Sequence, residues 1–129
     1  MRLETIHLKS ITIKLVNKGI YNRYCVNITD TSKLLHITPP AVSDKINRQK
    51  LPIWKKDNRD NNSTTWIPID VILEKIERDK LPDDLKLLVD AGQLQYDPYA
   101  SLIEALLRTG SLKWNDLEPA IQEKLVNFL

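Results

Sequence analysis

Prolines and the residues around them set the boundaries of the structural elements in most of this chain of 129 residues. Proline has no backbone N–H and a fixed φ angle, so it is tolerated in the first turn of a helix and disrupts regular structure elsewhere. Thr38, followed by Pro39 and Pro40, therefore predicts a helix that starts at Pro39 with Thr38 as its cap. This helix is expected to run to about Arg48, because Pro52 prevents any continuation.

A shorter helix is predicted immediately before this one. Residues 29–31 are Thr-Asp-Thr, whose side-chain oxygens can cap a helix that contains Leu34 and Leu35 and ends near His36. The two helices would then be joined by a tight turn, an arrangement typical of a helix-turn-helix.

Residues 53–67 combine an aromatic and basic start, a polar tract of Asp, Asn and Ser, and a β-branched and aromatic return. This pattern predicts a β-hairpin with a long tip. Trp54 and Trp66 would lie on opposite strands, where paired aromatic rings more often stabilise the hairpin than stack on nucleic-acid bases. Asp70 is then expected to cap a short helix that reaches Ile76.

The N-terminal segment 3–17 supports two interpretations. Leu3, His7, Ile11 and Leu15 recur at steps of four, which predicts a helix closed by a glycine two residues after the segment. The β-branched run of residues 11–13 favours a strand or hairpin instead. We predict the helix, followed by a short extended piece over Tyr21–Ile28.

From residue 81 onward the pattern is purely helical, with helices predicted over 82–91, from 98 to a stop at Gly110, and after a cap at Asp116. The apolar residues expected to face inward are Leu85, Leu88 and Val89 in the first, Leu102, Ile103, Leu106 and Leu107 in the second, and Leu117, Ile121, Leu125 and Phe128 in the third.

The net charge of +2 conceals an uneven distribution of charge. Residues 1–80 hold 15 Lys and Arg against 9 Asp and Glu, a net charge of +6, whereas residues 81–129 hold 4 against 8, a net charge of −4. Residues 31–59 alone hold seven basic against two acidic side chains. Such asymmetry indicates a polyanionic partner for the first half, although an unevenly charged solvated surface is the simpler alternative.

Four short motifs occur in this chain in the same order as in one known family. They are Ile37-Thr38-Pro39-Pro40-Ala41-Val42, Lys50-Leu51-Pro52, Trp66-Ile67-Pro68 and the helical segment Asp70–Ile76. Residues 30–78, which contain them, resemble the winged helix-turn-helix DNA-binding domains of the excisionase and MerR type. The family's usual glycine before the Leu-Pro pair is replaced here by Gln49-Lys50, and the hairpin, or wing, is longer than usual.

The resemblance implies that helix 39–48 reads the major groove and that wing 53–67 contacts the DNA backbone or the minor groove. If Val42 and Ile46 face inward, the outward side chains can reach base edges, and lysines on either side can reach phosphates. Asp44 could accept a hydrogen bond from cytosine, but an ion pair with Arg48 four residues later is the expected use. The predicted DNA-binding residues are Thr38, Pro40, Ser43, Lys45, Asn47, Arg48, Lys50, Lys55, Lys56 and Arg59.

The sequence predicts no enzyme activity, no cofactor and no metal site. His7 and His36 do not have the spacing of metal ligands with each other or with Cys25, which is expected to be buried and inert. A single cysteine and the absence of a long apolar run predict a cytoplasmic protein with no membrane partner.

Together these patterns predict a mainly α protein with a small β-hairpin wing. Residues 1–80 would form the winged helix-turn-helix DNA-binding domain. Residues 81–129 would form an acidic helical region that serves homodimerisation or partner binding, or that only completes the core of a monomer. We expect a sequence-specific double-stranded DNA-binding protein that regulates transcription. The alternatives are a winged-helix protein–protein interaction module, or an architectural DNA-binding factor in recombination or in plasmid or phage maintenance.

Overall fold

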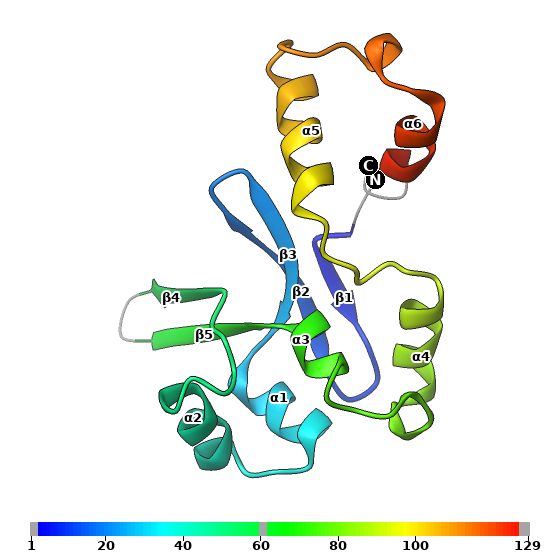
Figure 1. Cartoon of the computed structure of the whole chain (residues 1–129). Helices are drawn as coiled ribbons and strands as arrows, with labels where there is room; N and C mark the ends of the chain where they lie inside the picture. Colours follow the sequence, from blue (N-terminus) through cyan, green and yellow to red (C-terminus); the bar gives the residue numbers. More distant parts are fainter. Residues whose placement is uncertain (1–2, 60–61, 127–129) are drawn as a thin grey trace.

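The computed structural model describes residues 3–59 and 62–126, with only the backbone described at 58, 59, 62 and 63. Over these residues the chain forms a five-stranded antiparallel sheet and six α-helices (Figure 1). The strands are β1 (Thr5–His7), β2 (Thr12–Lys18), β3 (Tyr21–Val26), β4 (Lys55–Arg59) and β5 (Asn62–Pro68), in the order β1-β2-β3-β5-β4. The α-helices are α1 (Ile28–Leu35), α2 (Pro39–Asn47), α3 (Ile69–Leu73), α4 (Asp83–Asp90), α5 (Pro98–Arg108) and α6 (Pro119–Val126).

The prediction of a mainly α protein with a small hairpin wing is wrong. The helix expected over residues 3–17 is replaced by β1 and β2, which continue into β3 through a turn at Gly19. Ile6 and Ile13 lie directly opposite each other in this pairing and are both buried. The β-branched residues of β2 fit a strand with two partners, so pairing across the sheet overrides the helical spacing.

The hairpin β4–β5 is also part of the larger sheet rather than a separate wing. β5 pairs with β3 through two residue pairs, Cys25 with Pro68 and Val26 with Ile67. The side chains of Val26 and Ile67 are fully buried on the face of the sheet that carries the core. The hairpin over 53–67 is therefore confirmed as a hairpin, but it is anchored to the N-terminal strands.

The two helices predicted around the turn at residues 36–38 are confirmed. Thr38 caps α2, and its hydroxyl accepts a hydrogen bond from the Ala41 N–H at 3.3 Å. The cap of α1 is Asn27 rather than a residue of 29–31, and its side chain accepts from the Asp30 N–H at 2.8 Å.

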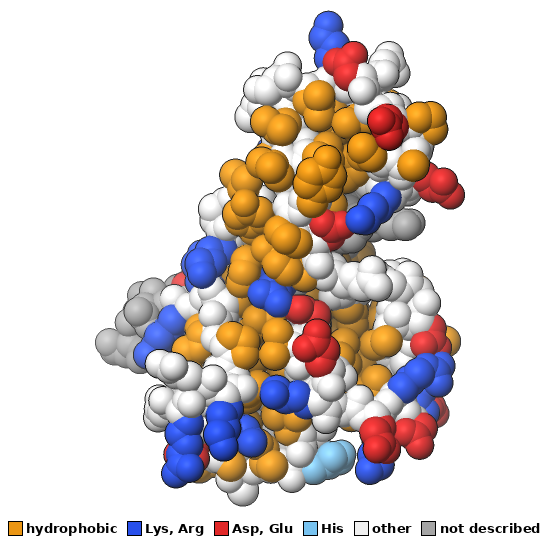
Figure 2. Space-filling model, in the orientation of Figure 1, with side chains coloured by type: hydrophobic (Ala, Val, Ile, Leu, Met, Phe, Trp, Pro, Cys, Tyr) orange, Lys and Arg blue, Asp and Glu red, His pale blue; other side chains and the backbone are white. Residues whose placement is uncertain are grey.

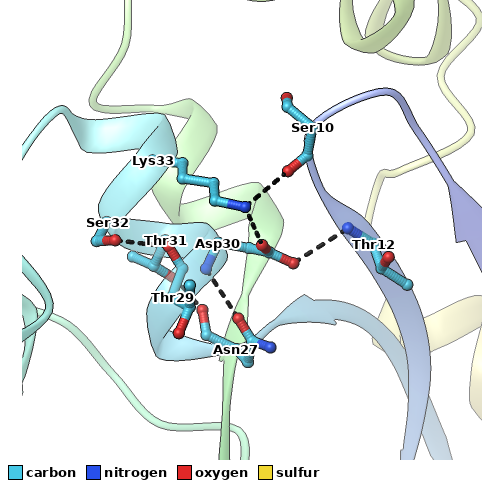
Figure 3. A network of polar contacts seen from close by, with 8 residues as sticks. All are labelled: Ser10, Thr12, Asn27, Thr29, Asp30, Thr31, Ser32 and Lys33. Atoms are coloured by element: carbon cyan, nitrogen blue, oxygen red, sulfur yellow. Dashed lines mark hydrogen bonds and ion pairs between the residues drawn. The ribbon is translucent and has the colours of Figure 1, made fainter.

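Asp30 does not cap α1, and its side-chain carboxylate instead connects this helix to the sheet (Figure 3). Its buried carboxylate accepts a hydrogen bond from the Thr12 N–H at 3.0 Å, at the first residue of β2. Lys33 lies one helical turn later, 3.7 Å from the same carboxylate, and donates to the Ser10 carbonyl at 3.2 Å. The helix-turn-helix is thus held to the β1–β2 turn by one carboxylate and one ammonium group.

Gln49 has a backbone conformation that favours glycine. Its φ angle is +59°, in the left-handed region, and the Lys50 N–H closes the turn by donating to the Lys45 carbonyl at 2.8 Å. This is the Schellman arrangement that ends many helices, and a side chain with a Cβ pays about 1–2 kcal/mol to adopt it.

We expect Gln49→Gly to raise the free energy of unfolding by about 0.5–1 kcal/mol, because relief of the left-handed strain outweighs the greater backbone entropy of glycine. Urea unfolding followed by circular dichroism measures the change. Gln49→Ala is the control and should give no gain, since alanine keeps the Cβ. A destabilised glycine variant would contradict this account of the turn.

The core has two parts, and their boundary does not coincide with the charge boundary at residue 80. The first lies between the sheet and the helices α1 to α4, and extends as far as Leu94. Leu85 of α4 is fully buried in it, with Leu88 and Val89 packed alongside as predicted. The second, smaller part lies between α5 and α6 around Leu125.

Two predictions about the C-terminal helices are wrong. Leu102 and Leu106 do not face inward but are 40% and 36% exposed on α5, because Ala100 and Ile103 face α6 instead. Asp116 does not cap α6, since it belongs to a 3-10 turn that ends before α6 begins. Phe128 lies outside the described residues.

Candidate nucleic-acid interface

Helix α2 is held by one face and leaves the other exposed to solvent. Val42 is fully buried, and Ile46 packs against the same core from one turn later. Pro40, Asp44 and Asn47 are exposed on the outer face. Ser43 is half-buried at its edge, so the outward surface of α2 is narrower than predicted.

Two of the predicted DNA-binding side chains already have partners within the protein. The Thr38 hydroxyl uses one of its two acceptor positions to cap α2, and its proton remains able to donate. The Arg48 guanidinium lies 3.2 Å from the Asp44 carboxylate, which is the expected ion pair between residues four apart. Both side chains of that pair are well exposed, so it contributes little to stability.

Lys45, a residue of α2, and Lys50 lie together at the C-terminal end of this helix, because the turn at Gln49 brings the chain back on itself. Lys75, from the turn after α3, joins them around a hollow of about 480 Å³. Lys75 was not predicted as a site residue. No signal in the sequence indicated it, since it lies 25 residues from Lys50 and only the packing of α3 against α1 brings it near.

Lys55 and Lys56 point to opposite faces of the hairpin, because successive residues of a strand alternate. Lys55 is paired with Trp66 and donates from Nζ to the Asn17 carbonyl at 3.3 Å, so it lies against β2 rather than beside α2. Lys56 is paired with Thr65, on the same face as Ile67 and the helices. The side chain of Arg59 and the hairpin tip lie outside the described residues.

Trp54 packs within the protein as predicted, but it lies before β4 and is not paired with Trp66, which lies opposite Lys55. The Trp54 indole N–H donates to the Val16 carbonyl at 3.0 Å, and its ring meets Tyr96 edge-on at 5.5 Å between centroids. The Arg23 guanidinium lies over both rings and forms two hydrogen bonds to Asp70, of 2.9 and 2.6 Å. Asp70 was predicted to cap α3, but its carboxylate instead joins α3 to Arg23 of β3.

Two pKa values in this region are shifted by burial and by the Arg23–Asp70 pair. Burial alone would lower the pKa of Arg23, but the hydrogen bond and the charge of Asp70 outweigh it and raise the pKa. Burial raises the pKa of the Cys25 thiol to about 12, and the nearby Arg23 charge lowers it only partly. Cys25 is therefore protonated at neutral pH, and it is fully buried as predicted.

Figure 2 shows how charged and apolar side chains are distributed over one face of the molecule. Lys and Arg side chains gather at the lower left, where Figure 1 places α2 and the hairpin, and acidic side chains mix with basic ones over α4 on the right. Apolar side chains cover much of the visible face of α5. Among the described residues no His, Cys, Asp and Glu side chains form a group of three or more that could hold a metal ion. No described helix combines the length and the apolar character needed to cross a membrane.

No family model, curated protein or solved structure matches this chain.

Proposed function

We propose that this chain is a sequence-specific double-stranded DNA-binding protein that regulates transcription, with α2 lying in the major groove. The observation that carries the proposal is the exposed outer face of α2, which is anchored from behind by the fully buried Val42. The major groove is ~12 Å wide and admits one α-helix, whose outward side chains then meet base edges.

Lysines border α2 at positions where phosphates would lie. Lys45 and Lys50 stand at its C-terminal end, and Lys56 is on the face of the hairpin turned toward the helices. Phosphate contacts of this kind fix the orientation of a protein on DNA, while the side chains in the groove supply specificity. The combination supports a reader of sequence in preference to a purely electrostatic binder.

Selection from random duplexes, followed by a salt titration, tests the proposal. We expect a defined binding site and a steep loss of affinity with salt, with a log–log slope of about −0.9 for each phosphate contacted. A sharply bent duplex would favour the architectural role. Absence of any selected sequence, together with binding to an acidic protein that duplex DNA does not displace, would support the protein–protein module and overturn the proposal.

Asn47→Ala should relax the preference at one base position of the selected site by about 1–3 kcal/mol, because an asparagine amide can pair with adenine N6 and N7. Asn47 is exposed at the end of α2, so the protein should remain folded. Competition among duplexes that differ at single positions measures the effect. A uniform loss across all sequences would place Asn47 on a phosphate instead.

The proposal includes a homodimer formed through α5. Tyr99, Leu102 and Leu106 lie at steps of three and four on this helix and are 58%, 40% and 36% exposed, so they form an apolar stripe. A second copy can cover such a stripe with the same stripe of its own in a two-fold arrangement. A two-fold dimer would present two copies of α2 to a pseudo-palindromic site, whose half-sites typically lie one helical turn, ~34 Å, or a multiple of it apart.

Leu102→Lys should convert the dimer to a monomer in sedimentation velocity, because it places a charge in the middle of the apolar stripe. Leu87→Lys is the matched control, since Leu87 is 73% exposed on α4, away from the stripe. A wild-type chain that sediments as a monomer at all concentrations would rule out this interface.

A further inference from the structure

A hollow of about 480 Å³ beside α2 has a composition suited to an anion. It is lined by two apolar side chains, Leu35 and Ile37, and by three lysines, Lys45, Lys50 and Lys75. Leu35 is the last residue of α1, and Ile37 lies in the turn between α1 and α2. The lysines come from α2, from the turn after it and from the turn after α3, so three separate segments contribute positive charge to one place.

The fold holds these lysines together by backbone contacts. The Lys50 N–H donates to the Lys45 carbonyl at 2.8 Å, which fixes the two residues side by side. The Lys75 N–H donates to the Ile72 carbonyl at 3.0 Å, and Ile72 is fully buried in the main core. The positions of the three backbones therefore do not depend on a ligand.

Nothing in the described part of the protein neutralises this cluster. None of the three ammonium groups forms an ion pair with a described carboxylate, whereas the nearby Asp44 is engaged by Arg48. Three like charges around one hollow repel one another, and a bound anion relieves that repulsion. The ammonium group is also a strong hydrogen-bond donor that commonly binds phosphate.

We propose that this hollow binds one phosphate of the DNA backbone, with the adjoining deoxyribose against Leu35 and Ile37. The inference rests on the proposed function and deepens it, because it fixes where the backbone passes α2 and adds Lys75 to the interface. The apolar lining distinguishes a sugar–phosphate unit from a bare inorganic anion, which would leave Leu35 and Ile37 uncovered.

The test compares salt titrations of a selected duplex with the wild-type chain, with Lys75→Gln and with the triple variant Lys45→Gln/Lys50→Gln/Lys75→Gln. Lys75→Gln should weaken binding about tenfold at fixed salt, since it removes one charge-assisted hydrogen bond. The triple variant should lower the magnitude of the log–log slope by about 0.9, the value for one phosphate. Lys113→Gln is the control for Lys75→Gln, because Lys113 is exposed between α5 and α6 and its loss also lowers the net charge by one unit.

The outcomes separate this inference from the function on which it rests. A wild-type chain that does not bind duplex DNA overturns both. Tight wild-type binding with an unchanged slope in the triple variant overturns the hollow alone, and a slope lowered by about 2.7 means three independent phosphate contacts instead of one shared site.

Methyl NMR signals of Leu35 and Ile37 identify the source of the phosphate. We expect them to shift when the duplex is added and to respond to inorganic phosphate only at millimolar concentration. Saturation by micromolar inorganic phosphate would identify a free anion as the ligand and overturn the assignment to the DNA backbone.

Discussion

Ile67→Ala should lower the free energy of unfolding by about 2–5 kcal/mol, one of the largest losses expected from a single substitution in this chain. Ile67 is fully buried, and it lies opposite Val26 in one of only two residue pairs that join β5 to β3 in the described sheet. Removing most of its side chain leaves a cavity where the hairpin, the N-terminal strands and α1 meet. Urea unfolding followed by tryptophan fluorescence measures the loss, since Trp54 and Trp66 flank this junction.

Ile53→Ala is the matched control for this substitution. Ile53 lies just before β4 and is 41% exposed, so the same change in side chain removes little buried surface. Its effect should stay within about 0.5–1 kcal/mol. A loss below about 1 kcal/mol for Ile67→Ala would mean that β5 is not anchored through this residue.

Asp70→Ala should cost about 2 kcal/mol, because it leaves the Arg23 guanidinium without its carboxylate among the rings of Trp54 and Tyr96. The side chain of Arg23 is only 17% exposed, so water replaces the two lost hydrogen bonds poorly. Chemical unfolding at neutral pH measures the loss. Arg23→Met combined with Asp70→Leu should cost less than the sum of the single changes, since neither charge is then left unpaired.

The pair between Arg78 and Asp90 provides the control. It has the same chemistry, an arginine that donates twice to one aspartate, but both side chains are well exposed. Asp90→Ala should therefore change stability little. Equal effects at Asp70 and Asp90 would show that burial is not what makes the Arg23–Asp70 pair important.

The elements that the sequence predicted correctly depend on neighbouring residues. Thr38 and Pro39 start α2 through purely local effects, because a capping side chain and a missing N–H act within one helical turn. The hairpin over 53–67 follows in the same way from its polar tip between two β-branched and aromatic runs. The turn after α2 takes the left-handed conformation at Gln49, although that conformation favours glycine.

The helix predicted over residues 3–17 and the cap predicted at Asp70 are wrong because the deciding partners are distant in the sequence. Residues 3–17 carry both a helical spacing and β-branched side chains, and only the pairing of β2 with β3 decides between them. Asp70 has the local features of a cap, but Arg23, 47 residues away, provides a stronger partner. Leu102 and Leu106 were expected inside because no local signal distinguishes a core stripe from an exposed one.

The candidate interface also combines features set by neighbouring residues with features set by distant ones. By itself the sequence determined the start and end of α2, its inner residues Val42 and Ile46, and a surplus of positive charge around it, since each of these follows from composition or spacing within a few residues. Only the tertiary structure decided that Lys55 turns toward β2 and that Lys75 joins Lys45 and Lys50, because strand register and helix packing bring together side chains that are far apart in the chain.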